Sequence, residues 1–183
     1  MADTPTPPVA DQPPLADQPP PVFRTSRRVE FGDTDMAGIV HFVNFFRYME
    51  AAETEFLRAR GLSVAWQDAG QRVGFPRVQV ACEYFKPAYF EDLLTIEVRL
   101  EKVGEKSLVW GFDFLRGDQL LARGKITSVC CRSNPDHRMV SVPIPPEIRA
   151  KLTAPAPGLR HATADQPPTG QPPTGQPPTD QPH

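Results

Sequence analysis

The sequence predicts an α+β domain in which an antiparallel β-sheet curls around one long helix. Three observations indicate this class. Residues 42–60 repeat apolar side chains at the spacing of a helix with one buried face. Four segments between residues 78 and 132 are rich in β-branched and aromatic residues and are separated by short turns. Helical and extended segments do not alternate, so we expect the strands to pair as antiparallel neighbours rather than through βαβ crossovers.

Proline separates a central domain from two tails. Eight of the 23 prolines lie in residues 1–21 and nine in residues 155–183. Both tails repeat the string ADQPP, which offers almost no apolar surface to bury. We therefore expect residues 1–21 and 154–183 to be disordered spacers, with docking of their PxxP spacings to an SH3-like groove as the alternative. Residues 22–153 have the size of one ordinary domain.

Composition and charge argue against several functional classes. The net charge is −2 and there is no basic tract, so nothing suggests a nucleic-acid surface. The N-terminus lacks the features of a signal peptide, and no apolar run is long enough to span a bilayer. Cys82, Cys130 and Cys131 are odd in number and lack metal-ligand spacing. We expect a cytoplasmic protein with reduced, packed cysteines, a catalytic thiol being the alternative.

The first two elements are a strand and the long helix. Residues 23–31 alternate weakly between apolar and polar side chains and are expected to form a strand. From Phe42 the apolar side chains follow the i, i+3, i+4, i+7 pattern, while charged residues lie on the opposite face. Gly61 is suited to end this helix because glycine readily adopts left-handed geometry. The helix should have about 18 residues and a length of about 27 Å.

The remaining elements form the sheet and a short last helix. Strands are predicted over residues 78–85, 93–103, 106–115 and 120–132. The connections that begin with Gly104 and Gly117 have hairpin chemistry, so the last three strands should form a meander. A final short helix should open at Pro145 and Pro146. Such a sheet leaves unpaired edges and apolar surface to cover, which favours a dimer.

The turn before the long helix contains the candidate site. Asp33 and Asp35 flank Thr34 a few residues before the helix begins. The first N–H groups of a helix are unpaired, and together with the positive end of the helix dipole they can bind an oxyanion. A carboxylate facing such an oxyanion site is the minimal arrangement for acyl transfer. From residue types alone, both aspartates can equally be solvated turn residues.

Residues 30–50, EFGDTDMAGIVHFVNFFRYME, resemble the signature of the 4-hydroxybenzoyl-CoA thioesterase family, whose members have the hot-dog fold. The resemblance extends over residues 23–150. It implies a curled, five-stranded antiparallel sheet around one central helix. In the family pattern GDxDxxGxV the second aspartate is catalytic, and this position is Asp35. The backbone N–H of Phe42 is the implied oxyanion donor, and Gly38 provides a backbone path that a side chain would obstruct.

The same resemblance implies further substrate contacts. His41 lies one position before a histidine found in one branch of related thioesterases, so pocket lining or simple surface placement are its alternatives to catalysis. Asn44 matches an asparagine of the 4-hydroxybenzoyl-CoA branch and is expected to cap the helix or touch the thioester. Lys106 and Ser107 resemble a family segment that contacts the CoA nucleotide. With Gly38, these residues form the predicted substrate-binding set.

The predicted function is hydrolysis of an aromatic or medium-chain acyl-CoA to free acid and CoA, without a metal ion or organic cofactor. Asp35 either attacks the thioester or orients a water that does; the sequence leaves both routes open. Four residues are candidates for an apolar acyl pocket, namely Phe42, Phe45, Phe46 and Phe75. The alternatives are a hot-dog dehydratase or hydratase and a non-catalytic acyl-CoA binding module. The expected partners are acyl-CoA and further copies of the chain, as a homodimer or tetramer.

Overall fold

The computed structural model describes residues 22–134 and 138–154, so the predictions for the two proline-rich tails lie outside the described residues. The main sheet has five strands, each antiparallel to its neighbours, in the order β1-β5-β6-β7-β4. The strands are β1 (Phe23–Arg28), β4 (Arg77–Tyr84), β5 (Leu93–Val103), β6 (Ser107–Arg116) and β7 (Gln119–Val129). The predicted antiparallel α+β architecture and the β5-β6-β7 meander are therefore confirmed.

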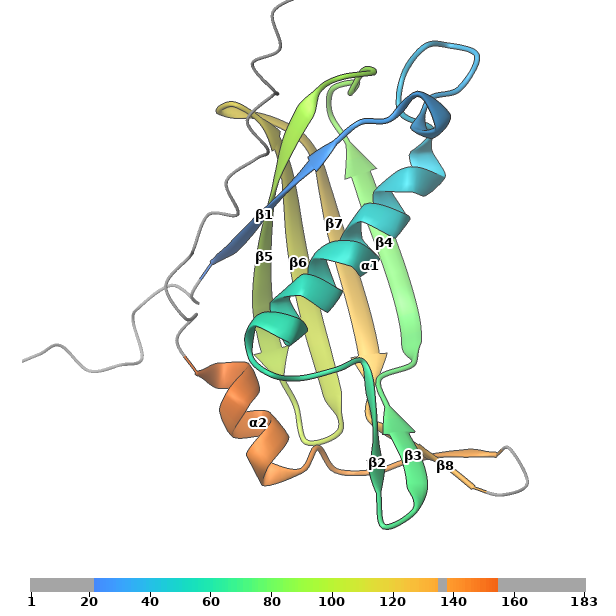
Figure 1. The fold of residues 1–183 in the computed structure, drawn as a ribbon, viewed down its shortest axis with the longest axis vertical. Coiled ribbons are helices and arrows are strands. Elements are labelled where there is room, and N and C mark those ends of the chain that lie inside the picture. Colours follow the sequence, from blue (N-terminus) through green and yellow to red (C-terminus); the bar gives the residue numbers. More distant parts are fainter. Residues whose placement is uncertain (1–21, 135–137, 155–183) are drawn as a thin grey trace, which may run out of the picture.

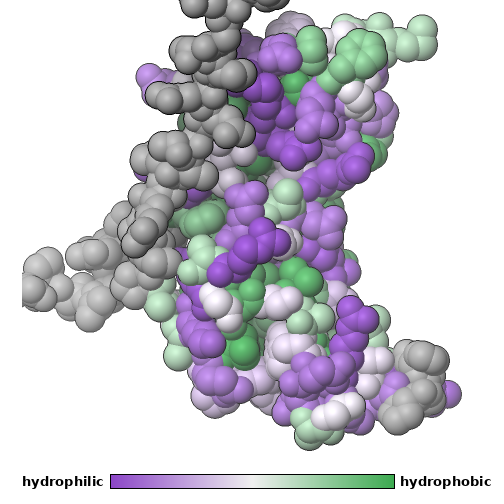
Figure 2. Space-filling model, viewed as in Figure 1, coloured by the Kyte–Doolittle hydropathy of each residue, from purple (hydrophilic) through white to green (hydrophobic). Residues whose placement is uncertain are grey.

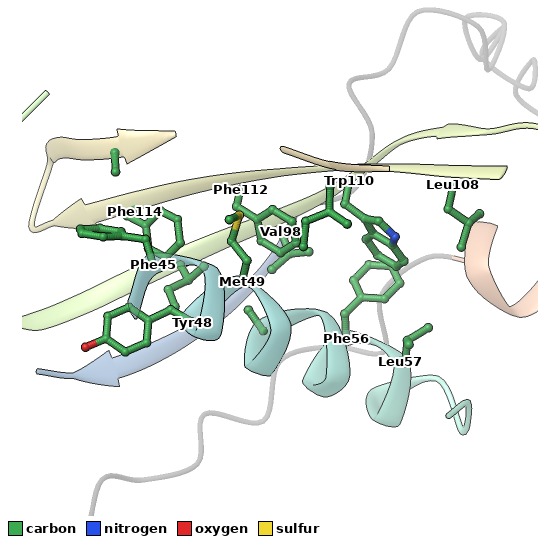
Figure 3. Close-up of a cluster of buried hydrophobic side chains, with 14 of the residues drawn as sticks. Phe45, Tyr48, Met49, Phe56, Leu57, Val98, Leu108, Trp110, Phe112 and Phe114 are labelled. Atoms are coloured by element: carbon green, nitrogen blue, oxygen red, sulfur yellow. The ribbon is translucent and has the colours of Figure 1, made fainter. Parts of the chain in front are cut away.

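Helix α1 (Phe42–Ala59) crosses one face of this sheet (Figure 1). Its apolar stripe packs against the inward side chains of the strands (Figure 3). Phe56 meets Trp110 edge to face with ring centroids 5.0 Å apart, and Phe45 meets Phe114 at 5.1 Å. Burying a large apolar side chain of this kind contributes about 1.5–3 kcal/mol. Hydrophilic residues cover much of the face that carries the outward side of α1 (Figure 2).

Two glycines shape the contact between the helix and the sheet. Gly124 on β7 faces α1, where a Cβ atom would collide with the Met49 side chain, so its absence lets the helix approach closely. Gly61 follows the helix with a φ of +63°, the left-handed conformation that the sequence predicted for the helix end. The helix therefore starts and stops where its sequence pattern indicates.

A second, four-stranded sheet was not predicted. It consists of β2 (Ala65–Asp68), β3 (Gln71–Gly74), β8 (Cys131–Ser133) and β9 (Met139–Ser141), in that order. The β2–β3 turn uses Ala69 and Gly70, both at positive φ (48° and 76°). Such a turn usually has Asn-Gly or Asp-Gly, and this sequence lacks that signal because alanine takes the first position. The predicted strand 120–132 is divided at Cys130, because the Cys130 N–H donates to the Lys106 carbonyl and β8 pairs with β3 instead.

The first strand is shorter than predicted. It ends at Arg28, and Phe31–Asp33 form a 3-10 turn, η2. Asp33 closes this turn because its carboxylate accepts a hydrogen bond from the Glu30 N–H at 2.9 Å. This turn directs the chain away from the sheet and into the loop that precedes α1.

The two edges of the main sheet differ from its centre. Strand β4 forms one edge, and most of its side chains are exposed, including Val78 (62% exposed) and Val80 (41%). Helix α2 (Pro146–Thr153) covers the end of the β5–β6 hairpin, where Arg149 donates to the carbonyls of Val103 and Gly104. No helix within the described residues is long and apolar enough to cross a membrane.

Candidate active site

The loop between η2 and α1 is closed at its base by hydrogen bonds. The Asp33 carbonyl accepts from the His41 N–H at 2.9 Å and from the Asn44 side-chain amide at 2.7 Å. Further along the loop, the Asp35 N–H donates to the Ile39 carbonyl at 2.9 Å. These bonds hold Asp35 beside the start of α1, so a short-range sequence motif becomes a defined spatial arrangement.

Asp33 is the buried member of the aspartate pair. Its carboxylate accepts from the Glu30 N–H, and the buried Tyr48 hydroxyl is close enough to feel its charge. Burial, followed by the neighbouring Asp33, raises the pKa of Tyr48 well above its usual value. Asp33 is therefore a buried residue that stabilises the loop through its hydrogen bonds.

Asp35, in contrast, is exposed on the loop. One of its carboxylate oxygens accepts from the Ala37 N–H at 2.8 Å, and the Gly38 N–H donates to the Asp35 carbonyl at 2.9 Å. Gly38 has a φ of +73°, which a residue with a side chain rarely adopts. The glycine thus permits the tight turn that presents the Asp35 carboxylate.

The first N–H groups of α1 are almost all satisfied. The Val43 N–H donates to Nδ1 of His41 at 3.3 Å, and the Asn44 N–H donates to the His41 carbonyl at 2.8 Å. No hydrogen bond among the described residues uses the Phe42 N–H. The helix therefore offers this one early N–H as a donor, at its positive end.

A cavity of about 570 Å³ is lined by both Asp35 and Phe42. Its volume falls in the range of small-molecule sites. Apart from Asp35 and Lys86 its walls are apolar or aromatic, and the lining consists of Asp35, Ile39, Val40, Phe42, Phe45, Tyr84, Phe85, Lys86, Pro87 and Ala88. A carboxylate, an unpaired backbone donor and an apolar recess can together perform acyl transfer.

Aromatic side chains form the inner wall of the cavity. Phe45 is buried and packs against the ring of Tyr84, with centroids 5.3 Å apart. The Tyr84 hydroxyl donates to the Phe42 carbonyl at 3.2 Å, which joins β4 to the first turn of α1. Burial is the main cause that raises the pKa of Tyr84 to about 12, so the hydroxyl remains a neutral donor near pH 7.

Several predicted residues lie outside the cavity lining. His41 caps α1, and Asn44 is buried with its amide on the Asp33 carbonyl. Lys106 and Ser107 lie at the β5–β6 hairpin: Ser107 pairs with Val129, whereas Tyr84 at the cavity pairs with Ala122. Ala122 faces Phe114, seven residues further along β6, which is roughly 24 Å at 3.4 Å per residue. Contact of these residues with substrate stays a prediction.

Two of the four aromatic pocket candidates line this cavity, Phe42 and Phe45. Phe46 faces a smaller groove of about 300 Å³ between α1 and β4, because it lies on the other side of the helix start. Phe75 packs on Trp66 with ring centroids 5.5 Å apart and belongs to the core beside the second sheet. The expectation that these two residues line the acyl pocket is not supported.

Sequence reasoning missed the wall supplied by residues 84–88. Tyr84 ends β4, and the following residues return toward the loop, where Tyr89 forms a bridge with Ile39. The available signal was the aromatic pair Tyr84-Phe85 at the end of a predicted strand, followed by Lys86-Pro87. It indicates a turn but does not say what the turn faces. Within residues 22–134 and 138–154, no three His, Cys, Asp or Glu side chains gather as metal ligands.

Comparisons of the sequence and of the fold with known proteins all find thioesterases. The sequence profile of the Thioesterase-like superfamily matches residues 29–152. The chain is 38% identical over 85 residues to a 4-hydroxybenzoyl-CoA thioesterase of Pseudomonas sp. strain CBS-3, covering 45% of this chain and 60% of that protein. It is 33% identical over 111 residues to a 1,4-dihydroxy-2-naphthoyl-CoA hydrolase of Prochlorococcus marinus strain NATL1A, covering 57% and 74%. The crystal structure of a 1,4-dihydroxy-2-naphthoyl-CoA thioesterase from Synechocystis superposes with a TM-score of 0.63 at 25% identity, covering 72% and 95%.

Proposed function

This chain belongs to the thioesterase-like superfamily, and from that premise we propose that Asp35 and the Phe42 N–H act together to hydrolyse an acyl-CoA thioester to free acid and CoA. The resemblance to 4-hydroxybenzoyl-CoA thioesterases and the hot-dog fold expected from it are both confirmed. The observation that carries the proposal is that one apolar cavity is lined by an exposed carboxylate and by the residue whose N–H is left unpaired at the helix start.

The mechanism follows from these two groups. The Phe42 N–H and the positive end of α1 polarise the thioester carbonyl and stabilise the oxyanion that forms on it. In one route an Asp35 oxygen attacks the carbonyl carbon, the carbon–sulfur bond breaks and water hydrolyses the resulting anhydride. In the other route Asp35 takes a proton from the attacking water. Thiols ionise near pH 8.5, so the thiolate leaves with little help from an acid in either route.

The acyl group that we propose is aromatic, with a medium-length aliphatic chain as the alternative. The cavity wall of Phe45, Tyr84 and Phe85 offers aromatic faces and edges to a ring. The relatives reported above are named for 4-hydroxybenzoyl-CoA and 1,4-dihydroxy-2-naphthoyl-CoA, both aromatic thioesters. Apolar walls also suit an alkyl chain, and so a substrate panel is needed to choose between them.

We further propose that the working unit contains at least two copies of the chain. Strand β4 is an edge with exposed apolar residues, and it lies next to the exposed Phe42 and Val43 of α1. Two β4 edges paired antiparallel about a two-fold axis would bring the Arg77 end of one strand beside the Tyr84 end of the other. This arrangement offers a route by which Lys106 of a second copy approaches CoA, although it is far from the cavity of its own copy. The free cysteines support a cytoplasmic location.

A panel of acyl-CoA substrates with thiol release followed over time tests the function. Benzoyl-type, naphthoyl-type and C6–C12 aliphatic thioesters should be compared by kcat/KM. We expect at least one member to be hydrolysed, with aromatic thioesters preferred. Binding of these substrates without thiol release would identify a non-catalytic binding module, and release of water from 3-hydroxyacyl-CoA in place of thiol would identify a dehydratase.

A further inference from the structure

His41 occupies the N-cap of α1, with extended backbone angles of φ −60° and ψ 132°. Its Nδ1 accepts from the Val43 N–H and its carbonyl from the Asn44 N–H. Its ring stacks on Phe42 with centroids 4.5 Å apart and planes 31° apart. His41 therefore accepts hydrogen bonds from two of the first helical N–H groups. Its ring also packs against Phe42, whose own N–H remains unpaired.

This cap has a specific electrostatic property. A nitrogen that accepts a hydrogen bond carries no proton, so an imidazole can cap the helix through Nδ1 only in its neutral form. Aspartate, a stronger and more usual cap, would put a negative charge next to the N–H that must stabilise an oxyanion. A neutral imidazole satisfies the helix end without opposing the charge that develops on the substrate.

We propose that His41 is a positioning residue for thioester hydrolysis: it caps α1 through Nδ1 and thereby holds the Phe42 N–H toward the cavity, and it transfers no proton itself. The inference rests on the proposed function of Asp35 and Phe42. His41 is not among the residues that line the cavity, whereas its two neighbours in this argument, Phe42 and Asp35, are. Its role is therefore exerted through the helix start.

Three substitutions separate capping from proton transfer. His41→Asn keeps a neutral cap, and we expect kcat within about three-fold of wild type and an unchanged Tm. His41→Ala removes the cap, and we expect Tm to fall by about 2–5 °C and kcat to fall about ten-fold, with a smaller change in KM. His41→Asp restores a strong cap, so its Tm should equal or exceed that of wild type, while kcat should fall about ten-fold or more.

Phe56→Leu is the matched control, because it destabilises the other end of α1 and should leave kcat unchanged at 25 °C. If His41→Asn is as inactive as His41→Ala, the imidazole transfers a proton and the capping role is overturned. Full activity of His41→Ala or of His41→Asp would overturn it as well. If the wild type hydrolyses no acyl-CoA, the proposed function fails; the order of Tm values then still decides whether His41 caps the helix.

Discussion

Asp33 and Asp35 are two residues apart in the sequence and have opposite surroundings. Asp33 is 8% exposed and its carboxylate is bound to the Glu30 N–H, whereas Asp35 is exposed on the cavity wall. The turn that separates them rotates one side chain inward and the other outward. Only the outward one can reach a substrate, which agrees with the role that the family resemblance assigns to Asp35.

Asp35→Asn should lower kcat by at least about 10³ and leave KM nearly unchanged, because the amide neither attacks the thioester nor accepts a proton from water. Steady-state kinetics on a substrate identified by the panel give the answer. Asp33→Asn is the matched control: it has the same change of side chain in the same loop, and we expect a smaller loss of activity, accompanied by lower Tm. Substantial kcat in Asp35→Asn would contradict the mechanism.

At the scale of elements, α1 and β4 are joined by an ion pair whose carboxylate is buried and whose guanidinium is partly exposed. Glu53 is 1% exposed on α1, and its carboxylate accepts from Arg77 of β4 at 2.8 Å. Burial is the largest influence on the pKa of Glu53 and raises it, while Arg77 acts in the opposite direction. The helix and the edge strand therefore depend on a carboxylate whose charged form is disfavoured by its surroundings.

The raised pKa of Glu53 predicts a pH-dependent contribution to stability. The folded state binds the proton more tightly than the unfolded state, so this contribution is complete below the ordinary glutamate pKa and is lost as pH rises through the raised value. Melting curves from pH 4 to 8 should show the Tm of Glu53→Gln rising relative to wild type as pH increases. Glu50→Gln, which alters an exposed carboxylate 3.6 Å from the same Arg77, is the control. A difference between wild type and Glu53→Gln that is constant with pH would refute the prediction.

At the scale of the whole molecule, the exposed β4 edge predicts self-association. The chain should sediment as a dimer or larger at assay concentrations, and Val78→Lys should shift it toward monomer because a lysine on an edge strand opposes pairing. Sedimentation velocity over a concentration series measures this directly. Lys102→Glu, a change at an exposed position of β5, three strands away from β4, should leave the association unchanged. A monomer with full activity would exclude a site shared between copies.

The CoA contact proposed for Lys106 is a separate prediction. Lys106→Glu should raise KM for acyl-CoA with less effect on kcat, because a phosphate contact is made equally in the ground and transition states. The increase should shrink as salt is added, since exposed charges are screened. An unchanged KM at low ionic strength would place the nucleotide elsewhere on the surface, with Lys86 at the cavity as the next residue to test.

The tails lie outside the described residues, so their role is predicted from composition alone. A chain of residues 22–153 should fold with nearly the same Tm and turnover as the full chain, because ADQPP repeats have little to pack. Thermal denaturation and the thiol-release assay on both chains provide the comparison. A Tm lower by more than about 5 °C, corresponding to about 1 kcal/mol or more, would show that the tails contact the domain.

The sequence by itself determined what depends on local pattern. The 3.6-residue period placed α1 from Phe42, the turn chemistry at Gly104 separated β5 from β6, and the carboxylates shortly before Phe42 indicated a candidate site at the helix start. These features follow from interactions between residues close in the chain, and so a short stretch of sequence is enough to predict them. The Ala69-Gly70 hairpin was missed because its turn residues are atypical.

Tertiary structure alone decided which distant residues meet. Strand order and register set Tyr84 beside Phe42 and leave Lys106 at the opposite end of the sheet. The fold also directs the Asn44 amide to the Asp33 carbonyl, a role that the residue type permits but does not specify. Such contacts depend on how strands pair and on which face of a helix is buried. No local sequence pattern contains this information, because it arises only when separate segments pack together.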